Sequence, residues 1–233
     1  MGIQERKGRE KEQRKEEIVD AAQRIFFEKG LQTATIDEIA EAAELSKGTI
    51  YLYYKSKEDL YLAVVMRGMQ LLQDMFLSRV QTENDLLKAL LAAVTSYVEF
   101  FKIHRNYFRM FQYLQTPQFH KQVSAEMKEA SSLISQKTWS LVIDLLQRGI
   151  DEGVLVPDVT AAEAAVVLWT SSTSLLMRMD TETDLWKQKM NLDLEEVLRL
   201  SNALLLGALL TPSARKQNMV LLKSMHPRIQ LNL

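Results

Sequence analysis

Apolar residues recur along most of this chain at the three- and four-residue spacing of one face of an α-helix. The first such stripe contains Ile18, Ala22, Ile25 and Phe26, and Gly30 then predicts the end of that helix. Only 4 Pro and 8 Gly occur among 233 residues, and runs of β-branched residues are few. The pattern therefore predicts an all-α protein.

Capping residues divide the chain into helices. Thr35 with Glu38 and Thr160 with Glu163 have the spacing of capping boxes. Further helix starts are predicted at Ser46, Ser56, Thr82 with Asp85, Thr116-Pro117, Asp193 with Glu196, and Thr211-Pro212. We expect the helix from Thr116 to continue to Gly149 or Gly153, the helix from Thr160 to end near Met179, residues 180–191 to form a polar connection, and the last large helix to cover 194–210.

Two short predicted helices with a tight turn lie between residues 35 and 57. The second, Lys47–Tyr53, has Ile50 as its core anchor and polar groups on the rest of its surface, and no acidic residue occurs between Lys47 and Lys57. This arrangement is typical of a helix-turn-helix, whose second helix enters the DNA major groove. The alternative is an ordinary amphipathic helix pair with a solvated basic face.

The same segment resembles the DNA-binding domain of the TetR/AcrR family of bacterial transcriptional regulators. The resemblance rests on Thr35, Ile39-Ala40, Ala43, Leu45-Ser46, Gly48, Tyr51, Tyr53-Tyr54, Lys57 and Leu60, with Ile18, Ala21-Ala22, Phe26, Phe27 and Gly30 upstream. Glu44 departs from the family pattern, which usually has Gly there, and a left-handed turn residue other than Gly costs about 1–2 kcal/mol. The resemblance implies an N-terminal three-helix DNA-binding domain with a helix-turn-helix, followed by a larger helical ligand-binding and dimerisation domain.

We accordingly divide the chain into a basic N-terminal arm (1–13), a helix-turn-helix domain (14–74) and a helical ligand-binding and dimerisation domain (75–233). The net charge is −1, so DNA binding requires a local basic patch. The expected DNA contacts are Thr35, Ser46, Lys47, Gly48, Thr49, Tyr51, Tyr53, Lys55 and Lys57. The arm is either a solvated tail or an element that strengthens phosphate attraction, and its last residues are able to extend the first helix.

Large apolar side chains are concentrated in the middle of the chain. Each of them alone is more typical of a core, but Met and aromatic residues together also suit an adaptable ligand pocket. The expected ligand-binding residues are Met66, Met69, Tyr97, Phe101, His104, Phe108, Phe111, Trp139 and Trp169. The expected effector is a small, apolar molecule.

Two predicted helices are apolar on most sides, at 161–168 and 204–210. A helix of this kind is buried from most sides, either by its own chain or by a second subunit. The resemblance implies the second of these, a homodimer formed through the last two large helices, which would bind a palindromic double-stranded DNA operator.

The sequence offers little for catalysis. It contains no Cys and three scattered His, and it lacks H-E-x-x-H, G-x-S-x-G and Gly-rich phosphate motifs, so we expect no enzyme, metal site or cofactor. A charged N-terminus and short apolar runs predict neither a signal peptide nor a membrane span, and hence a cytoplasmic protein. We expect a ligand-responsive repressor. The alternatives are a constitutive DNA-binding protein whose helical domain only dimerises, and a helical enzyme with a degenerate DNA domain.

Overall fold

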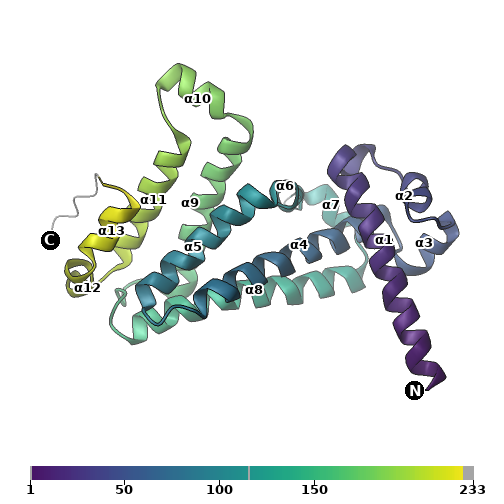
Figure 1. The fold of residues 1–233 in the computed structure, drawn as a ribbon, viewed down its shortest axis with the longest axis horizontal. Helices are drawn as coiled ribbons and strands as arrows, with labels where there is room; N and C mark the ends of the chain where they lie inside the picture. Colours follow the sequence, from purple (N-terminus) through teal and green to yellow (C-terminus); the bar gives the residue numbers. More distant parts are fainter. Residues whose placement is uncertain (1, 115, 228–233) are drawn as a thin grey trace. The chain divides into compact units, whose positions relative to one another are not determined.

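The computed structural model describes residues 2–114 and 116–227, and these residues form α-helices joined by short connections (Figure 1). Among the described residues, β-structure is limited to one isolated antiparallel bridge between Leu155 and Leu210. The helices are α1 (Ile3–Thr33), α2 (Ile36–Ala42), α3 (Lys47–Tyr53), α4 (Lys57–Val80), α5 (Leu86–Ile103), α6 (Arg105–Tyr113), α7 (Pro117–Gln122), α8 (Ala125–Asp151), α9 (Ala161–Thr181), α10 (Thr183–Met190), α11 (Leu194–Leu209), α12 (Pro212–Gln217) and α13 (Met219–Met225). An all-α fold is therefore confirmed.

The helices belong to two compact units that alternate along the sequence. The first unit comprises 1–72 and 103–136, and the second comprises 73–102 and 137–233, as far as these residues are described. The expected division at residue 74 treats the DNA-binding part as one continuous stretch, whereas the first unit also includes α6, α7 and the start of α8. Residue 1 of the expected arm and residues 228–233 of the expected second domain lie outside the described residues.

The first unit is built around α1. Its Ile18 and Ala22 are almost fully buried, as are Ile39 of α2 and Ile50 of α3. These side chains form the core that packs α1, α2 and α3 together with the start of α4. We call α1 to α3 with Lys57–Val64 the head. Gly30 leaves the helical conformation with φ 73°, so the regular part of α1 ends where the sequence predicts.

Aromatic rings connect the head to α6 and α7. Tyr61 of α4 makes edge contacts with Phe26 of α1 at 5.1 Å between ring centroids, with Tyr113 at 5.8 Å and with Phe119 at 5.6 Å. Burial in this cluster raises the pKa of Tyr61 well above its ordinary range. The phenol therefore stays neutral, and its hydroxyl donates to the carbonyl of Met110 of α6 at 3.4 Å.

The core of the second unit is aliphatic. Leu90 of α5, Leu146 of α8, Leu168 of α9 and Leu206 of α11 belong to one buried cluster. Figure 1 shows α9 and α11 side by side, with α10 connecting them at one end. Their contact carries two hydroxyl-mediated hydrogen bonds, Ser172 to Asn202 at 3.0 Å and Ser171 to Ser201 at 2.8 Å.

Most predicted helix starts are confirmed. Thr35 and Thr160 form capping boxes with Glu38 and Glu163. Ser46 caps α3, and Ser56 accepts a hydrogen bond from the backbone of Asp59 in the first turn of α4 at 2.9 Å. These interactions are local, which is why sequence spacing reveals them.

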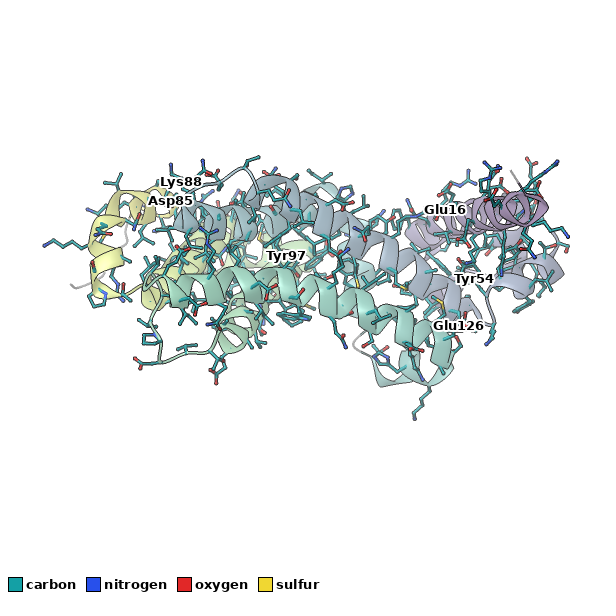
Figure 2. The ribbon with its side chains drawn as sticks, turned by 90° about the horizontal axis from the view of Figure 1, so that it is seen from below. Glu16, Tyr54, Asp85, Lys88, Tyr97 and Glu126 are labelled. Carbon is teal, nitrogen blue, oxygen red and sulfur yellow. The ribbon has the colours of Figure 1, made fainter. Side chains whose placement is uncertain are left out.

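Two predicted caps are wrong in part. Asp85 caps α5 by accepting from the backbone nitrogen of Lys88 at 2.9 Å (Figure 2), whereas Thr82 donates back to a carbonyl of α4. Asp193 caps α11, but its partner is the backbone of Glu195, and Glu196 instead pairs with Arg199.

Three predicted segments differ from the structure. The expected helix from Thr116 is broken at Val123-Ser124 into α7 and α8; there the backbone nitrogen of Ser124 donates to buried Asp59 of α4 at 2.8 Å, and the Ser124 hydroxyl accepts from the backbone of Met127 at 3.3 Å. Residues 180–191 include the helix α10. The N-terminal arm is helical from Ile3 onward, so it is a continuation of α1.

Candidate nucleic-acid interface and ligand cavity

The turn between α2 and α3 is held by backbone geometry. Glu44 has φ 55°, which is the left-handed conformation expected at a position where the family usually has Gly. The backbone nitrogen of Leu45 returns to the carbonyl of Ala40 at 2.9 Å, and Ser46 then accepts from the backbone of Thr49 at 3.1 Å. The turn fixes α3 on the head with one fully buried side chain, that of Ile50.

The rest of α3 is a surface. Ser46, Lys47, Gly48 and Tyr51 are exposed, and a Cβ added at Gly48 would meet nothing nearer than the Ser46 hydroxyl at 3.7 Å. Thr49 is half-buried, and its hydroxyl shares a hydrogen bond with that of Ser46 at 2.8 Å. A backbone and a set of hydroxyls that lie open in this way suit close contact with a nucleic acid.

Leu52 was not among the expected contacts, yet it is 82% exposed, the most open side chain of α3. It follows Tyr51 on the side of α3 opposite Ile50, and the position of Ile50 as the sole anchor was the signal that could have identified it. An apolar side chain here is suited to a thymine methyl or a sugar.

The lysines around α3 have partners inside the chain. Lys47 pairs with Asp37 of α2 at 2.8 Å, and this hydrogen bond raises the pKa of Lys47. Lys55 lies 3.6 Å from Glu126, and both side chains are widely exposed. The acid-free stretch of the sequence is thus not acid-free in space, although exposed pairs of this kind are weak and exchange readily with other ions.

Lys57 differs from the other two lysines. Its ammonium group donates to the carbonyl of Ala34 at 2.7 Å, just after the end of α1. Thr35, next to Ala34, is exposed, and its hydroxyl accepts a hydrogen bond from the backbone of Glu38 in the capping box. Tyr53 is half-buried at the end of α3. Six of the nine expected DNA contacts therefore belong to α3 and its cap, while Thr35 caps α2, Lys55 follows α3 and Lys57 begins α4.

A polar junction that sequence reasoning missed joins α1, α4 and α6. Arg67 of α4 makes ion pairs with Glu16 and Asp20 of α1 and donates to the amide oxygen of Gln23 at 3.1 Å. The same oxygen accepts from the hydroxyl of Tyr107 of α6 at 2.6 Å. No local pattern predicts this junction, since each of its hydrogen bonds joins residues at least 44 positions apart.

The nine expected ligand-binding residues are divided between the two units. Met66, Met69, His104, Phe108 and Phe111 belong to the first unit, and Tyr97, Phe101, Trp139 and Trp169 to the second. In the second unit, Trp139 packs edge-on against Trp169 at 5.4 Å, and Tyr97 bonds to Thr173 at 2.7 Å. Burial raises the pKa of Tyr97 to about 12. Whether these residues bind a ligand stays a prediction.

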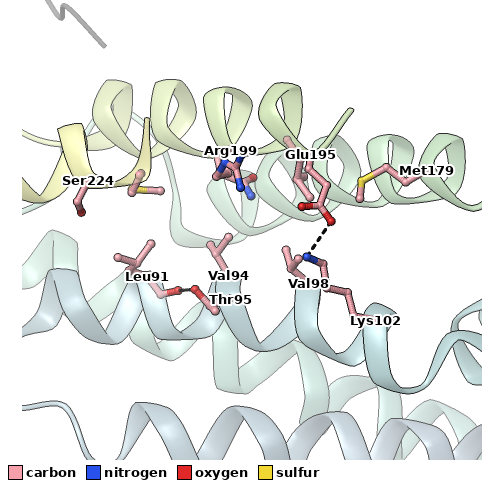
Figure 3. Close-up of a pocket in the computed structure, with 12 residues that line it drawn as sticks. Leu91, Val94, Thr95, Val98, Lys102, Met179, Glu195, Arg199 and Ser224 are labelled. Carbon is pink, nitrogen blue, oxygen red and sulfur yellow. Dashed lines mark hydrogen bonds and ion pairs between the residues drawn. The ribbon is translucent and has the colours of Figure 1, made fainter. Parts of the chain in front are cut away.

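A cavity of about 330 Å³ lies in the second unit between α5, α11 and α13 (Figure 3). Its walls include Leu91, Val94 and Val98 of α5, and Lys102 pairs with Glu195 across it at 2.8 Å. The remaining lining residues are Thr95, Met179, Leu198, Arg199, Asn202, Ser224 and Met225. None of the nine expected residues lines this cavity. It depends on the approach of α13 to α5, which no local signal predicts.

The described residues contain no group of three side chains placed to hold a metal ion. Among the helices in the described ranges, none is long and apolar enough to cross a membrane.

Comparisons with known proteins agree with the geometry of the head. A model of the family described as "Bacterial regulatory proteins, tetR family" matches residues 18–64. The HTH-type transcriptional activator FasR of Mycolicibacterium smegmatis is 29% identical over 135 residues, which cover 57% of this chain and 60% of FasR. The negative regulator of the biofilm operon icaADBC, IcaR of Staphylococcus aureus, is 26% identical over 125 residues, covering 53% of this chain and 66% of IcaR.

A similar solved structure is that of the transcriptional regulator FadR from Bacillus subtilis in complex with stearoyl-CoA. It has a TM-score of 0.63 and 20% identity, and the match covers 83% of this chain and 98% of FadR. At this identity the likeness concerns the fold.

Proposed function

The chain belongs to the tetR family of bacterial regulatory proteins, and on that premise we propose that it is a DNA-binding transcriptional regulator that works as a ligand-responsive repressor in the cytoplasm. The observation that carries the proposal is the surface of α3, anchored by Ile50 alone and open at Lys47, Gly48 and Tyr51. In a helix-turn-helix this surface lies in the major groove.

The expected contacts divide into two sets. Lys55, Lys57 and the hydroxyls of Thr35 and Tyr53 flank α3 and are suited to phosphates, which position a protein without reading sequence. Ser46, Lys47, Gly48, Thr49 and Tyr51 form the N-terminal part of α3 and its cap, where base edges are read. Thr49 must release its bond to Ser46 or share it in order to contribute.

Selection of duplexes from a random-sequence pool by the purified protein tests this function. We expect a palindromic operator, because a symmetric dimer presents two copies of α3. Tyr51→Ala should then lose more affinity for that operator than for random DNA, by about 1–3 kcal/mol per base contact. Lys55→Ala, the matched control, should weaken both equally. A pool without sequence enrichment would contradict the proposal.

The dimer itself is proposed from exposed apolar side chains on the paired helices of the second unit. Val166, Val167, Trp169 and Met177 of α9 and Leu204 of α11 are between 38% and 51% exposed, an unusual concentration for a surface that faces water. Leu205 is partly buried against the core of its own chain. A second copy that covers both helices would bury this surface.

The effector is proposed to be a small, mainly apolar molecule bound by the helices that follow the head. Two sites are available, the cavity between α5, α11 and α13 and the expected set of aromatic and Met residues. The ligand must bind the non-operator state more tightly, since otherwise it shifts nothing. FadR was crystallised with stearoyl-CoA, a polar, charged CoA group with an apolar acyl chain, which supports an effector with an apolar portion for a protein of this fold.

Operator binding measured against a panel of apolar compounds tests responsiveness. A compound that releases the protein from the operator should lose its effect in Val94→Trp if it occupies the cavity, because Val94 lines the wall. Phe108→Ala, in the first unit, is the control for the other site. If no compound changes operator binding, the constitutive alternative holds.

A further inference from the structure

The beginning of α1 is a helix without a packing partner. Residues 4–13 are exposed, and the first buried side chain of the helix is Ile18. At about 1.5 Å per residue, the stretch from Ile3 to Gln13 projects about 16 Å from the rest of the head. Figure 1 shows this end of α1 extending past α3. We call residues 3–15 the overhang.

Charge on the overhang is sorted by helix face. Lys7, Lys11, Arg14 and Lys15 stand at the spacing i, i+4, i+7 and i+8, and the next member of that series is the buried Ile18. The acids stand elsewhere: Glu5, Glu12 and Glu16 share a second face, and Glu10 and Glu17 a third. The cationic stripe thus lies on the same face of α1 as the buried side chains that begin at Ile18, in the part of the helix that projects from the rest of the head.

Ion pairs within the helix involve two members of the stripe and leave the other two, Lys7 and Lys11, without an acidic partner among the described residues. Arg6 pairs with Glu10 at 2.8 Å, and Arg14 and Lys15 pair with Glu17 and Glu12. Two unneutralised ammonium groups one turn apart, on an exposed face, are the arrangement that binds successive phosphates.

We propose that the overhang is a rigid phosphate clamp, in which Lys7 and Lys11 bind the DNA backbone outside the site read by α3. This inference rests on the proposed function and extends its footprint. Lys7 and Lys11 lie one helical turn apart, about 5.4 Å along the axis of α1, so their ammonium groups can reach neighbouring phosphates of one strand. Because these contacts are made to phosphates, they add affinity and leave sequence preference unchanged.

The experiment compares two double variants of the full-length protein, Lys7→Gln/Lys11→Gln and Arg6→Gln/Arg9→Gln, on a mixed-sequence 40-bp duplex. Each double variant removes two positive charges from the overhang, and Gln has nearly the same helix propensity as Lys and Arg. The second pair lies off the stripe. Affinity is measured by fluorescence anisotropy over a salt series, and circular dichroism checks that helix content is kept.

The Lys7/Lys11 variant should lower the slope of log affinity against log salt by about 2 per bound chain, at about 0.9 per phosphate contact. The Arg6/Arg9 variant should change it by less than half as much. Equal changes in both variants would reduce the effect to diffuse charge and overturn the clamp, as would an unchanged slope in the first. If the parent protein binds no duplex at all, the proposed function fails as well, so the two failures are distinguishable.

Anionic vesicles containing phosphatidylserine are the second arm. The clamp predicts that neither double variant changes vesicle binding. A loss of vesicle binding in the Lys7/Lys11 variant, with DNA binding unchanged, would assign the stripe to a membrane surface and overturn the proposal.

Discussion

Gly68 of α4 is the position where one added methyl group should reveal how tightly α6 is held. A Cβ built there lies 2.8 Å from Cγ of Tyr107 and still closer to Cδ1, whereas real Cβ contacts under 3.0 Å essentially never occur. The ring is restrained on both sides: its hydroxyl bonds to Gln23 at 2.6 Å, and Phe27 packs edge-on against it at 4.9 Å. The ring therefore has little freedom to move away from a new methyl group.

Two opposing effects set the magnitude for Gly68→Ala. Overpacking costs about 1–3 kcal/mol. Replacing Gly by Ala inside a helix gains about 1 kcal/mol through helix propensity. In the parent protein the sum should be destabilising by up to about 2 kcal/mol. In a Tyr107→Ala background the clash is gone, so the same change should stabilise by up to about 1 kcal/mol.

Urea unfolding at one fixed protein concentration, which keeps any dimer contribution constant, measures the cycle. The coupling free energy between the two positions should be about 1–3 kcal/mol. Tyr107→Phe is the control, because it removes the bond to Gln23 and keeps the ring in place. The penalty for Gly68→Ala should persist in that background. A coupling below about 0.5 kcal/mol would refute the close packing of α6 on α4.

Three further outcomes are expected. The pKa of Glu38 lies below 4.5, mainly because Lys29 donates a hydrogen bond to its carboxylate. The ionised Glu38 therefore stabilises the fold above pH 4.5, and this stabilisation is lost as the pH falls through the lower folded-state pKa. Glu38→Gln should flatten the acid side of a plot of urea midpoint against pH, and an unchanged plot would contradict this. Lys57→Met should weaken binding to operator and random DNA alike and reduce the salt slope by about 1. It should also lower the melting temperature, because the Ala34 carbonyl after α1 loses its donor. Lys55→Met should weaken DNA binding alone, and equal melting shifts in the two variants would contradict the distinction. Leu204→Glu should give a folded monomer in sedimentation, since this side chain is 45% exposed in the single chain, and a persisting dimer would place the interface elsewhere.

Sequence reasoning succeeded where interactions are local. The capping box of Thr35 with Glu38, the cap at Ser46 and the anchor Ile50 all lie within a few residues of their partners. The strained conformation of Glu44 could likewise be predicted, since the family pattern has Gly at that turn. Local spacing therefore predicts the two helices of the helix-turn-helix, and the family pattern adds the conformation of the turn between them.

It failed where a distant residue decides. Between Thr116 and Gly149 the helical pattern runs without an obvious stop, and the break at Ser124 combines a local cap, with Met127, and a bond to Asp59, 65 residues away. Residues 180–191 are too polar to show a buried stripe, and α10 accordingly has no buried residue. It is held by contacts of Trp186 with Glu182 and Arg178. The cavity is missed for a similar reason, because its wall includes the C-terminal α13.

The bond between Asp59 and Ser124 also has a mechanical consequence. Asp59 stands in the first turn of α4 and Ser124 immediately before α8, so the two long helices share one fastened end. Asp59 is 1% exposed, and a buried acceptor that loses its donor is costly, so sliding of one helix along the other is resisted at that point. The start of α4 and the start of α8 are thus kept in register along their lengths.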